Sequence, residues 1–321
     1  MLRLSSLLEN VTSVGITGHI RPDGDCVGST LGLYNYITEN YPDISTDIYI
    51  GEFSESFNFL KNSDKIVHNY TGNTKQYDLF FVLDCGDLKR MGDADGLFNA
   101  AKKTVCIDHH ISNASFADEN YIVPDASSAS ELVFNTMEED KISKETAECL
   151  YMGIAHDTGV FQYSCTSAGT MQAAGILMEK GINFSKIVDE TYYQKTFHQN
   201  QILGRALLES ITFLDGKAIV SVIKKDTMNL YEVTPKDLDG IVNQLRVTKG
   251  VECAIFMYEV ASQQYKVSLR SNELVDVSKI AMHFGGGGHV RAAGCEMNGN
   301  MYDVINNLSA KIEEQIEAAN V

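Results

Sequence analysis

The sequence predicts an α/β protein with two domains, and three observations support this class. Up to about residue 188, short apolar runs of strand character alternate with helix-compatible runs, a pattern typical of a mainly parallel sheet with flanking helices. After about residue 209, strand-like runs follow one another directly, which indicates a separate sheet. The length of 321 residues, 44% of them hydrophobic, suffices for two cores.

The first domain is expected to span residues 1–188. Its predicted strands are residues 14–17, 46–50, 78–83 and 103–107. Its predicted helices are residues 27–39, 128–138, 144–155 and 170–179. These elements alternate along the chain, as parallel strands joined by helical crossovers require.

Residues 189–208 are polar, helix-compatible and free of proline, and are expected to form a helical connector. Residues 209–321 are expected to form a smaller α/β domain with a mixed sheet. Its predicted strands are residues 211–214, 217–223, 251–260 and 265–270, and its predicted helices are residues 276–283 and 302–318.

Composition narrows the classes of function. The formal net charge of −17 argues against a protein that binds long duplex nucleic acid over its surface, because phosphate neutralisation needs clustered Lys and Arg. No apolar run is long enough for a membrane span, and the first ten residues do not form a secretory signal. Seven scattered cysteines without a CxxC pair indicate reduced thiols. We therefore expect a cytoplasmic protein without a membrane partner.

Acidic and histidine clusters follow three predicted strands and one predicted helix. The clusters are His19, Asp23 and Asp25 after residues 14–17, Asp84 after residues 78–83, Asp108, His109 and His110 after residues 103–107, and Asp157 after residues 144–155. In open α/β sheets, ligands bind beyond the carboxyl ends of the strands. Carboxylates and imidazoles suit divalent cations such as Mn²⁺, and converging carboxylates repel one another unless a cation lies between them. The sequence therefore predicts a metal site.

Each cluster has a simpler interpretation when it is taken alone. The segment from Pro22 to Asp25 could be a solvated turn, Asp157 a polar helix end, and the paired histidines one buried and one exposed imidazole. The occurrence of all four clusters in the expected places favours the metal site. Residues 127–131 have the pattern of a helix N-cap, although their hydroxyl groups could also approach the metal crevice.

A second group of residues suggests an anion site in the second domain. Residues 285–288 are four glycines, and successive glycines let backbone N–H groups converge on an anion. His289 and Arg291 add charge at the same place, and the small residues that follow suggest the start of a helix. A flexible linker is the alternative. Arg246 and Arg270 are further candidates for binding phosphate, although each could form a surface ion pair.

These motifs together resemble the DHH phosphoesterase superfamily with its DHH-associated domain. The resemblance rests on His19-x-x-x-Asp23-x-Asp25, Asp84, Asp108-His109-His110, Asp157 and the glycine segment, and it spans nearly the whole chain. The two-domain organisation is most similar to the branch of short-oligonucleotide exonucleases (nanoRNases, or oligoribonucleases) that also remove the 3′-phosphate of adenosine 3′,5′-bisphosphate (pAp).

The resemblance implies two Mn²⁺ ions, with Mg²⁺ or Co²⁺ as alternatives. One ion would be held by His19, Asp23 and Asp84, and the other by Asp25, Asp84, His109 and Asp157. It implies catalytic roles for Asp108, which would orient its neighbours, and for His110, which would contact the scissile phosphate or the leaving oxygen. The implied substrate-binding residues are Arg90, Arg270, Gly286, Gly287, Gly288, His289 and Arg291. The resemblance also implies that the active site lies in the cleft between the two domains.

The implied substrate is a short oligonucleotide or nucleotide, and a homodimer is left open. Related enzymes cleave cyclic di-AMP or its linear product pApA, and the same metal geometry serves hydrolysis of polyphosphate or pyrophosphate, so both activities are alternatives. A nucleotide-binding sensor without turnover is the non-enzymatic alternative. It is disfavoured because every metal-ligand motif is complete.

Overall fold

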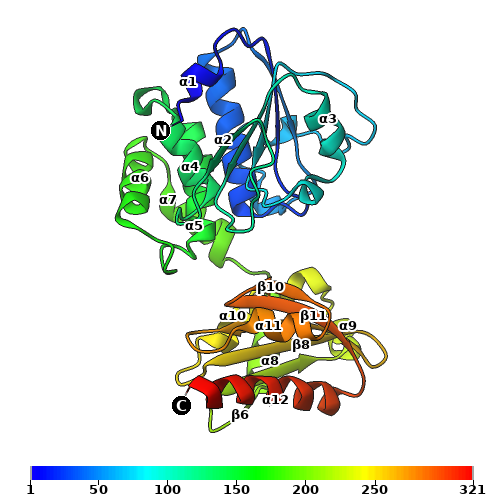
Figure 1. Ribbon diagram of the computed structural model, residues 1–321. Helices are drawn as coiled ribbons and strands as arrows, with labels where there is room; N and C mark the ends of the chain where they lie inside the picture. Colours follow the sequence, from blue (N-terminus) through cyan, green and yellow to red (C-terminus); the bar gives the residue numbers. More distant parts are fainter. Residues whose placement is uncertain (1, 320–321) are drawn as a thin grey trace. The chain divides into compact units, whose positions relative to one another are not determined.

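The computed structural model describes residues 2–319, and the chain divides into two compact units, Met1–Gln194 and Lys195–Val321 (Figure 1). The segment predicted as a connector is not one continuous helix. It consists of the π-helix η5 (Asp189–Tyr193), a break at residues 194–196, and α8 (Phe197–Leu208). Ile202 and Ala206 of α8 are buried in a core of the second unit, so α8 belongs to that unit.

Unit 1 contains a parallel five-stranded sheet in the order β2-β1-β3-β4-β5. The strands are β1 (Ser13–Thr17), β2 (Ser45–Tyr49), β3 (Leu79–Leu83), β4 (Thr104–Asp108) and β5 (Glu119–Ile122). All four neighbouring pairs are parallel. The strand β5 was not predicted, because its residues are only half-buried and begin with a charged and a polar side chain.

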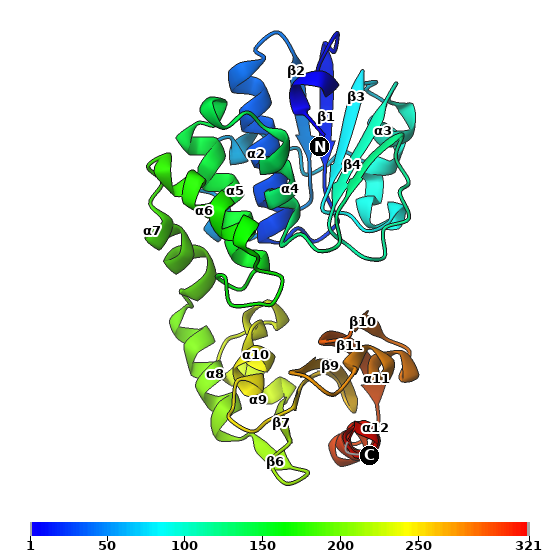
Figure 2. The ribbon, with the colours of Figure 1, turned by 60° about the vertical axis from the view of Figure 1, so that its left-hand side comes forward.

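Both faces of this sheet are covered. In β3, Leu79, Phe81 and Leu83 point into one core, and Phe80 and Val82 point into another. Burial on both sides explains why parallel strands have continuous apolar sequences. Figure 2 shows α2, α4, α5 and α6 on one side of the sheet and α3 on the other.

The helices of unit 1 agree in type with the predicted ones and add short segments between them. They are α1 (Leu4–Leu7), α2 (Gly24–Asn40), α3 (Asp95–Ala100), α4 (Ala129–Thr136), α5 (Lys144–Asp157), α6 (Ala168–Glu179) and α7 (Phe184–Val188). Short 3₁₀ segments are η1 (Glu55–Phe57), η2 (Ser63–Lys65), η3 (Leu88–Ala94) and η4 (Glu139–Lys141).

The helices α2 and α5 pack against each other at glycines. A Cβ atom on Gly28 would lie 2.6 Å from the carbonyl oxygen of Cys149 and 2.9 Å from the backbone of Gly153. A Cβ atom on Gly24 would collide with the ring of His156. The first turn of α2 therefore lies directly against the last turn of α5, and each of these turns carries a predicted metal ligand.

Unit 2 contains a mixed six-stranded sheet in the order β10-β11-β9-β8-β7-β6. The strands are β6 (Ile211–Phe213), β7 (Ala218–Ile223), β8 (Cys253–Ala261), β9 (Gln264–Ser271), β10 (Gly287–His289) and β11 (Ala292–Asn298). The strands β7 and β8 are parallel, and the other neighbours are antiparallel. The mixed sheet predicted for this domain is confirmed.

Helices cover both faces of the second sheet as well. They are α8, α9 (Lys225–Leu230), η6 (Pro235–Leu238) and α10 (Ile241–Arg246) on one face, and α11 (Val277–His283) and α12 (Met301–Ala319) on the other (Figure 2). Within residues 2–319, no helix is both long enough and apolar enough to span a membrane.

The segment after the four glycines is a strand, so the predicted helix start was wrong. Ala293, Cys295 and Met297 of β11 alternate toward the core, and β11 pairs with β9 along its whole length. This period of two, rather than the small size of the residues, decides the conformation. Cβ atoms on Gly286 or Gly288 would collide with residues of β11, so glycine permits the close pairing of the β10–β11 hairpin.

Candidate active site

The ends of three neighbouring strands bring the predicted ligands of unit 1 together. Because β1, β3 and β4 are adjacent and parallel, the loops that follow them leave the same edge of the sheet. The end of α5 reaches the same edge through its contact with α2. The structure thus gathers His19, Asp23, Asp25, Asp84, Asp108, His109, His110 and Asp157 at one place.

The first group of predicted ligands surrounds the ring of His19. Its Nε2 atom lies 3.4 Å from Asp84 Oδ2 and 3.6 Å from Asp23 Oδ2. Its Nδ1 atom lies 2.8 Å from the carbonyl oxygen of Ile20. When the ring is neutral, a hydrogen bond from Nδ1–H to that carbonyl leaves the lone pair of Nε2 for a cation, which is the arrangement common in histidine metal ligands.

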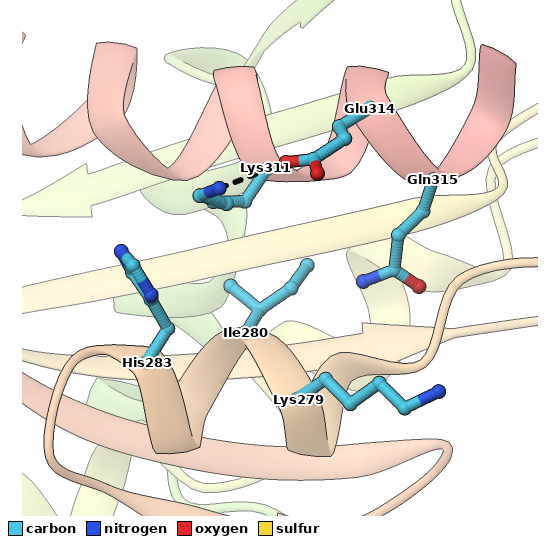
Figure 3. Close-up of a pocket in the computed structure, with 6 residues that line it drawn as sticks. All are labelled: Lys279, Ile280, His283, Lys311, Glu314 and Gln315. Atoms are coloured by element: carbon cyan, nitrogen blue, oxygen red, sulfur yellow. Dashed lines mark hydrogen bonds and ion pairs between the residues drawn. The ribbon is translucent and has the colours of Figure 1, made fainter. Parts of the chain in front are cut away.

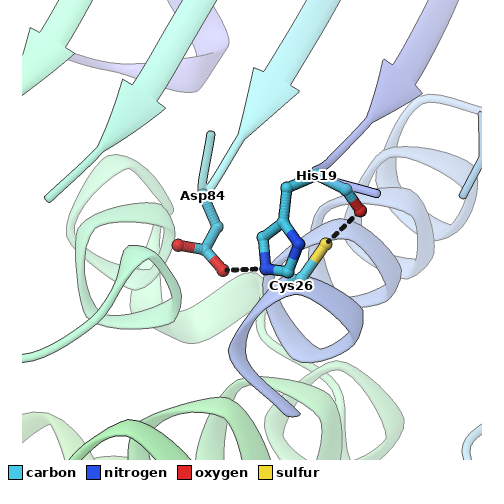
Figure 4. A group of neighbouring side chains, drawn as sticks. All are labelled: His19, Cys26 and Asp84. Atoms are coloured by element: carbon cyan, nitrogen blue, oxygen red, sulfur yellow. Dashed lines mark hydrogen bonds and ion pairs between the residues drawn. The ribbon is translucent and has the colours of Figure 1, made fainter. Parts of the chain in front are cut away.

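Cys26 belongs to the same neighbourhood but was not predicted. Figure 4 shows its Sγ atom beside His19, where it contacts the carbonyl oxygen of His19 at 3.8 Å, with Asp84 on the other side of the ring. Complete burial, reinforced by the negative charge of Asp84, raises the pKa of the Cys26 thiol. A neutral thiol that donates to a backbone carbonyl supports the loop and is a poor metal ligand.

The second group of predicted ligands surrounds His109. Its Nε2 atom lies 3.1 Å from Asp157 Oδ2, 3.5 Å from Asp84 Oδ1 and 4.0 Å from Asp25 Oδ2. One oxygen of Asp84 therefore faces the His19 group and the other faces the His109 group. This is the arrangement that a carboxylate bridging two cations would need.

Asp84 adopts an unusual backbone conformation. Its φ angle is 51°, in the left-handed region that non-glycine residues rarely occupy. The backbone N–H of Asp84 donates to the carbonyl oxygen of Ile107 at 3.1 Å, so the sheet holds the residue in this conformation. The side chain is 3% exposed, and a buried carboxylate is costly unless partners compensate it. The strain is consistent with a functional role.

The imidazoles of the cluster have raised pKa values. Burial alone would favour the neutral ring of His19, but hydrogen bonds with Asp23 and Asp84 outweigh it and raise the pKa of His19 to about 10. Burial is likewise outweighed at His109, where the surrounding carboxylates raise the pKa to about 10. Without a cation, protonated imidazoles supply the positive charge between the carboxylates.

The carboxylates respond in opposite directions. Burial and the charge of Asp84 raise the pKa of Asp25 to about 7, and burial together with Asp25 raises the pKa of Asp157. At Asp84 burial is outweighed, and hydrogen bonds from His109 and His19 lower the pKa. In the metal-free site, protonated groups thus surround the ionised carboxylate of Asp84. A divalent cation would displace their protons.

His110 is oriented by a chain of hydrogen bonds. Its Nδ1 atom lies 2.7 Å from Oδ1 of the fully buried Asp108, whose Oδ2 accepts from Asn113 Nδ2 at 2.7 Å. The Nε2 atom of His110 lies 3.4 Å from the Arg90 guanidinium. Asn113 was missed by the sequence interpretation, and its position three residues after the paired histidines is the signal that could have revealed it.

The predicted substrate-binding residues of unit 2 lie near the β10–β11 hairpin and the end of β9. Arg291 donates to the carbonyl oxygens of Glu273 and Val275 and lies 3.5 Å from the hydroxyl of Ser271. His289 is exposed at the end of β10, where it pairs with Ala292 across the hairpin.

Arg270 lies on β9, next to Ala292 of the hairpin strand β11. Its guanidinium bonds the side chain of Asn243, and that of Arg246 bonds the side chain of Asn272 at 2.7 Å. The structure thus supports these basic groups with backbone carbonyls and amides. The glycines lie in the same domain: Gly287 and Gly288 belong to β10, and Gly286 directly precedes this strand.

A cavity of about 280 Å³ between α11 and α12 lies elsewhere in unit 2. Its lining is shown in Figure 3 and consists of Lys279, Ile280, His283, Lys311, Glu314 and Gln315. Lys311 is paired with Glu314 at 2.8 Å. No predicted site residue lines this cavity, so it is separate from the candidate active site.

The donor chemistry of unit 1 fits divalent cations. Each of the two groups around His19 and His109 combines carboxylate oxygens with an imidazole nitrogen, and they share Asp84. Such mixed oxygen and nitrogen sets suit first-row divalent metals. A carboxylate cluster on a parallel sheet, together with a second domain that carries a glycine and arginine segment, is an arrangement that suits a metal-dependent phosphoesterase.

Comparisons with known proteins identify the family. Residues 13–154 match the DHH family, N-terminal domain, and residues 215–318 match the DHHA1 domain. The protein belongs to the DHH family of phosphoesterases, which depend on metal ions.

Several relatives align along most of their length. The chain is 27% identical over 303 residues to the "Bifunctional oligoribonuclease and PAP phosphatase NrnA" of Bacillus subtilis, with 92% of each chain covered. It is 29% identical over 307 residues to the protein of the same name from Mycoplasma pneumoniae, with 91% of each covered. The crystal structure of an exopolyphosphatase-related protein from Bacteroides fragilis has a TM-score of 0.89 at 27% identity, covering 97% of this chain and 94% of that one.

Proposed function

We propose that this protein hydrolyses short oligoribonucleotides, the 3′-phosphate of pAp, or both, and that it uses two Mn²⁺ ions. The observation that carries this proposal is the shared carboxylate of Asp84, which faces the His19 group with one oxygen and the His109 group with the other. The names of the aligned relatives, oligoribonuclease and PAP phosphatase, supply the substrate class.

The proposed ligands form two sets. His19, Asp23 and Asp84 would hold one cation, and Asp25, Asp84, His109 and Asp157 the other, with Mg²⁺ or Co²⁺ as alternatives to Mn²⁺. Paired divalent cations lower the pKa of water and neutralise charge that develops on phosphoryl oxygens. The carboxylates and imidazoles of this chain would hold both cations in place. The hydrolysis would then need no covalent intermediate.

His110 would act on the phosphoryl group. Asp108 accepts from Nδ1 of His110 at 2.7 Å, so Nε2 is left to face the substrate beside Arg90. In hydrolysis, water adds to phosphorus, the ester P–O bond breaks, and the leaving oxygen takes a proton. His110 would contact that oxygen or the scissile phosphate, and Arg90 would balance phosphate charge.

The residues of unit 2 would hold the non-reacting part of the substrate. Arg270, His289 and Arg291 would bind a terminal phosphate or a base, with the backbone of Gly286, Gly287 and Gly288 as further donors. A site that binds a substrate terminus favours short substrates.

We also propose that the protein acts in the cytoplasm.

Two other activities use the same kind of site. Cleavage of cyclic di-AMP or pApA would make the protein a signalling enzyme. Hydrolysis of polyphosphate gains support from the exopolyphosphatase-related protein with a similar structure. Neither of these activities matches the name oligoribonuclease of the aligned relatives as directly as hydrolysis of short RNA does.

The deciding experiment is a Mn²⁺-dependent turnover panel. It compares pAp, labelled RNA of two to five nucleotides, pApA, cyclic di-AMP and tripolyphosphate, with Asp84→Asn protein as the blank. We expect the highest kcat/KM for short RNA or pAp. Preference for a cyclic or linear adenine dinucleotide, or for tripolyphosphate, would replace the proposed substrate. Binding without any turnover that depends on Asp84 would favour a nucleotide-binding sensor.

A further inference from the structure

Two backbone N–H groups at the start of helix α4 donate to the carboxylate of Asp25. Its Oδ2 accepts the backbone N–H of Ala129 at 2.6 Å, and its Oδ1 accepts that of Ser130 at 2.9 Å. Ala129 and Ser130 are the first two residues of α4, so these N–H groups have no partner within the helix. Each oxygen of Asp25 retains a further lone-pair direction for a cation.

The start of α4 is itself fixed by a buried carboxylate. Glu131 Oε2 accepts the backbone N–H and the hydroxyl of Ser127, and it also accepts the hydroxyl of Thr170 at 2.8 Å. Ser128 caps the helix by accepting the backbone N–H of Glu131 at 3.0 Å. Glu131 is 8% exposed, and among residues 2–319 no Lys or Arg forms an ion pair with it.

Burial of the ionisable Glu131 side chain costs free energy, and the capping of α4 does not require this residue. Ser128 already serves as the N-cap, and a buried carboxylate without a cationic partner is expensive. The three donors on one oxygen of Glu131 join the segment before α4 to the start of α6, where Thr170 is part of the capping box. The carboxylate therefore fixes two helix starts relative to each other.

The fit around Asp25 leaves little freedom. A Cβ atom on Gly153 of α5 would collide with the hydroxyl of Ser130 and would lie 3.0 Å from Asp25 Oδ1. Asp25 is only 1% exposed. A small shift of α4 would therefore turn the carboxylate or break its hydrogen bonds, because the packed surroundings cannot absorb it.

We propose that Glu131 is a positioning residue for Asp25: it fixes the start of α4, whose backbone N–H groups aim the Asp25 carboxylate at a bound cation. This inference rests on the proposed role of Asp25 as a metal ligand. Groups that orient metal ligands typically change metal affinity by about 10-fold to 100-fold when they are removed.

The test is the Kd of Mn²⁺ for the full chain, measured by isothermal titration calorimetry. Glu131→Ala should raise the Kd by about 10-fold or more, and Glu131→Gln, which retains an acceptor oxygen, should restore part of the affinity. At saturating Mn²⁺ the kcat of Glu131→Ala should return toward the wild-type value, since the substitution weakens metal binding and removes no reacting group.

Thr136→Ala is the matched control. Thr136 is buried at the other end of α4, and its hydroxyl bonds only the carbonyl oxygen of Val133 among the described contacts. Its loss should lower the Tm without changing the Kd. Melting curves without metal report the structural contribution of each substitution separately from its effect on metal binding.

The outcomes separate this inference from the proposed function. If the wild-type chain does not bind Mn²⁺, the proposed metal site fails, and this inference fails with it. If Asp25→Asn weakens binding but folded Glu131→Ala binds with the wild-type Kd, only this inference is overturned. Should Glu131→Ala not fold, Ser127→Ala and Thr170→Val decide in its place, and wild-type Kd values for both would overturn it.

Discussion

The two units of this protein differ in charge and in how they present their candidate functional groups. Of the formal net charge of −17, unit 2 carries 13 Lys and Arg against 15 Asp and Glu, a net −2, and unit 1 carries the remaining −15. In unit 1 the candidate groups of the cluster are buried or half-buried, apart from the exposed Asp23, and contact one another directly. In unit 2 they are on an exposed hairpin and a strand end.

This difference indicates a division of chemistry. A buried acidic cluster repels anionic substrates unless cations occupy it, so unit 1 suits metal binding and the reacting phosphoryl group. A nearly neutral surface with arginines and glycines can bind phosphate without metal. We therefore expect substitutions in unit 1 to abolish turnover and substitutions in unit 2 to change substrate preference.

The largest expected effect is that of Asp84→Asn. Asparagine keeps the shape of the side chain but has neither the charge nor the second anionic oxygen that would face both ligand groups. Turnover should fall below detection, and Mn²⁺ binding should be lost, while circular dichroism shows a folded protein.

Asp78→Asn is the control for that substitution. Asp78 immediately precedes β3, at the opposite end from Asp84, and accepts from the backbone N–H of Thr12 at 2.9 Å and from Lys102 at 2.7 Å. This control should lose stability and keep its activity. Full activity of Asp84→Asn would refute the bridging role and remove the contrast between the units.

The affinity for Mn²⁺ should depend strongly on pH. In the metal-free site the pKa values of His19 and His109 are raised to about 10, so both rings are protonated at neutral pH and must lose a proton to become ligands. Raising the pH removes these competing protons, and affinity should increase about tenfold per pH unit for each proton displaced.

Titration calorimetry between about pH 6 and about pH 9, in buffers of different ionisation enthalpy, measures both affinity and proton release. Affinity that stays constant over this range, without proton release, would contradict the proposal that the two imidazoles are ligands. Arginine remains charged over this range, so the guanidinium groups of unit 2 should contribute no proton release.

An intermediate effect is expected for Asn113→Ala. The substitution removes the donor to Oδ2 of Asp108 and should let that carboxylate and His110 turn away from their present positions. We expect kcat to fall by about 10-fold to 100-fold with little change in KM.

Asn120→Ala provides the matched control, because Asn120 lies at the start of β5 and, among the described residues, its amide bonds only the backbone of Ala117. It should leave kcat unchanged. Equal losses in both variants would mean that the segment between β4 and β5 as a whole matters, rather than the orientation of His110.

The smallest effect on turnover is expected for Arg291→Ala. The KM for pAp and other phosphate-terminated substrates should rise about tenfold, because a charged hydrogen bond is worth about 1.5–3 kcal/mol. The Arg291→Ala variant should hydrolyse a chromogenic phosphodiester without a terminal phosphate at the normal rate. The control Arg205→Ala removes the ion pair between Arg205 of α8 and Glu209 directly after this helix, and it should change the KM for neither substrate.

The contacts of Arg291 with the carbonyl oxygens of Glu273 and Val275 offer a structural alternative for this residue. If that alternative holds, the Tm falls and both substrates are affected equally. Comparison of the two substrates in the same variant therefore decides between binding and support of the hairpin.

Several features of the sequence led directly to the fold and to the site. The strands β1, β3 and β4 were predicted because their apolar runs are short and continuous, as burial on both faces requires. Polar residues at the ends of these runs then had to share one edge of the sheet. The strands β5 and β10 were missed, since half-buried polar residues and glycines lack a periodic signal, and β11 was wrongly predicted as the start of a helix.

The sequence by itself determined the class of fold and the family and supplied the candidate ligands, because the period of apolar residues and the position of acids after strands are local properties. Only the tertiary structure decided which oxygen of Asp84 faces which histidine, that Asn113 orients Asp108, and that Glu131 fixes the helix holding Asp25. These contacts join residues distant in the chain, and their distances depend on the packing of α2, α4 and α5, which no local pattern specifies.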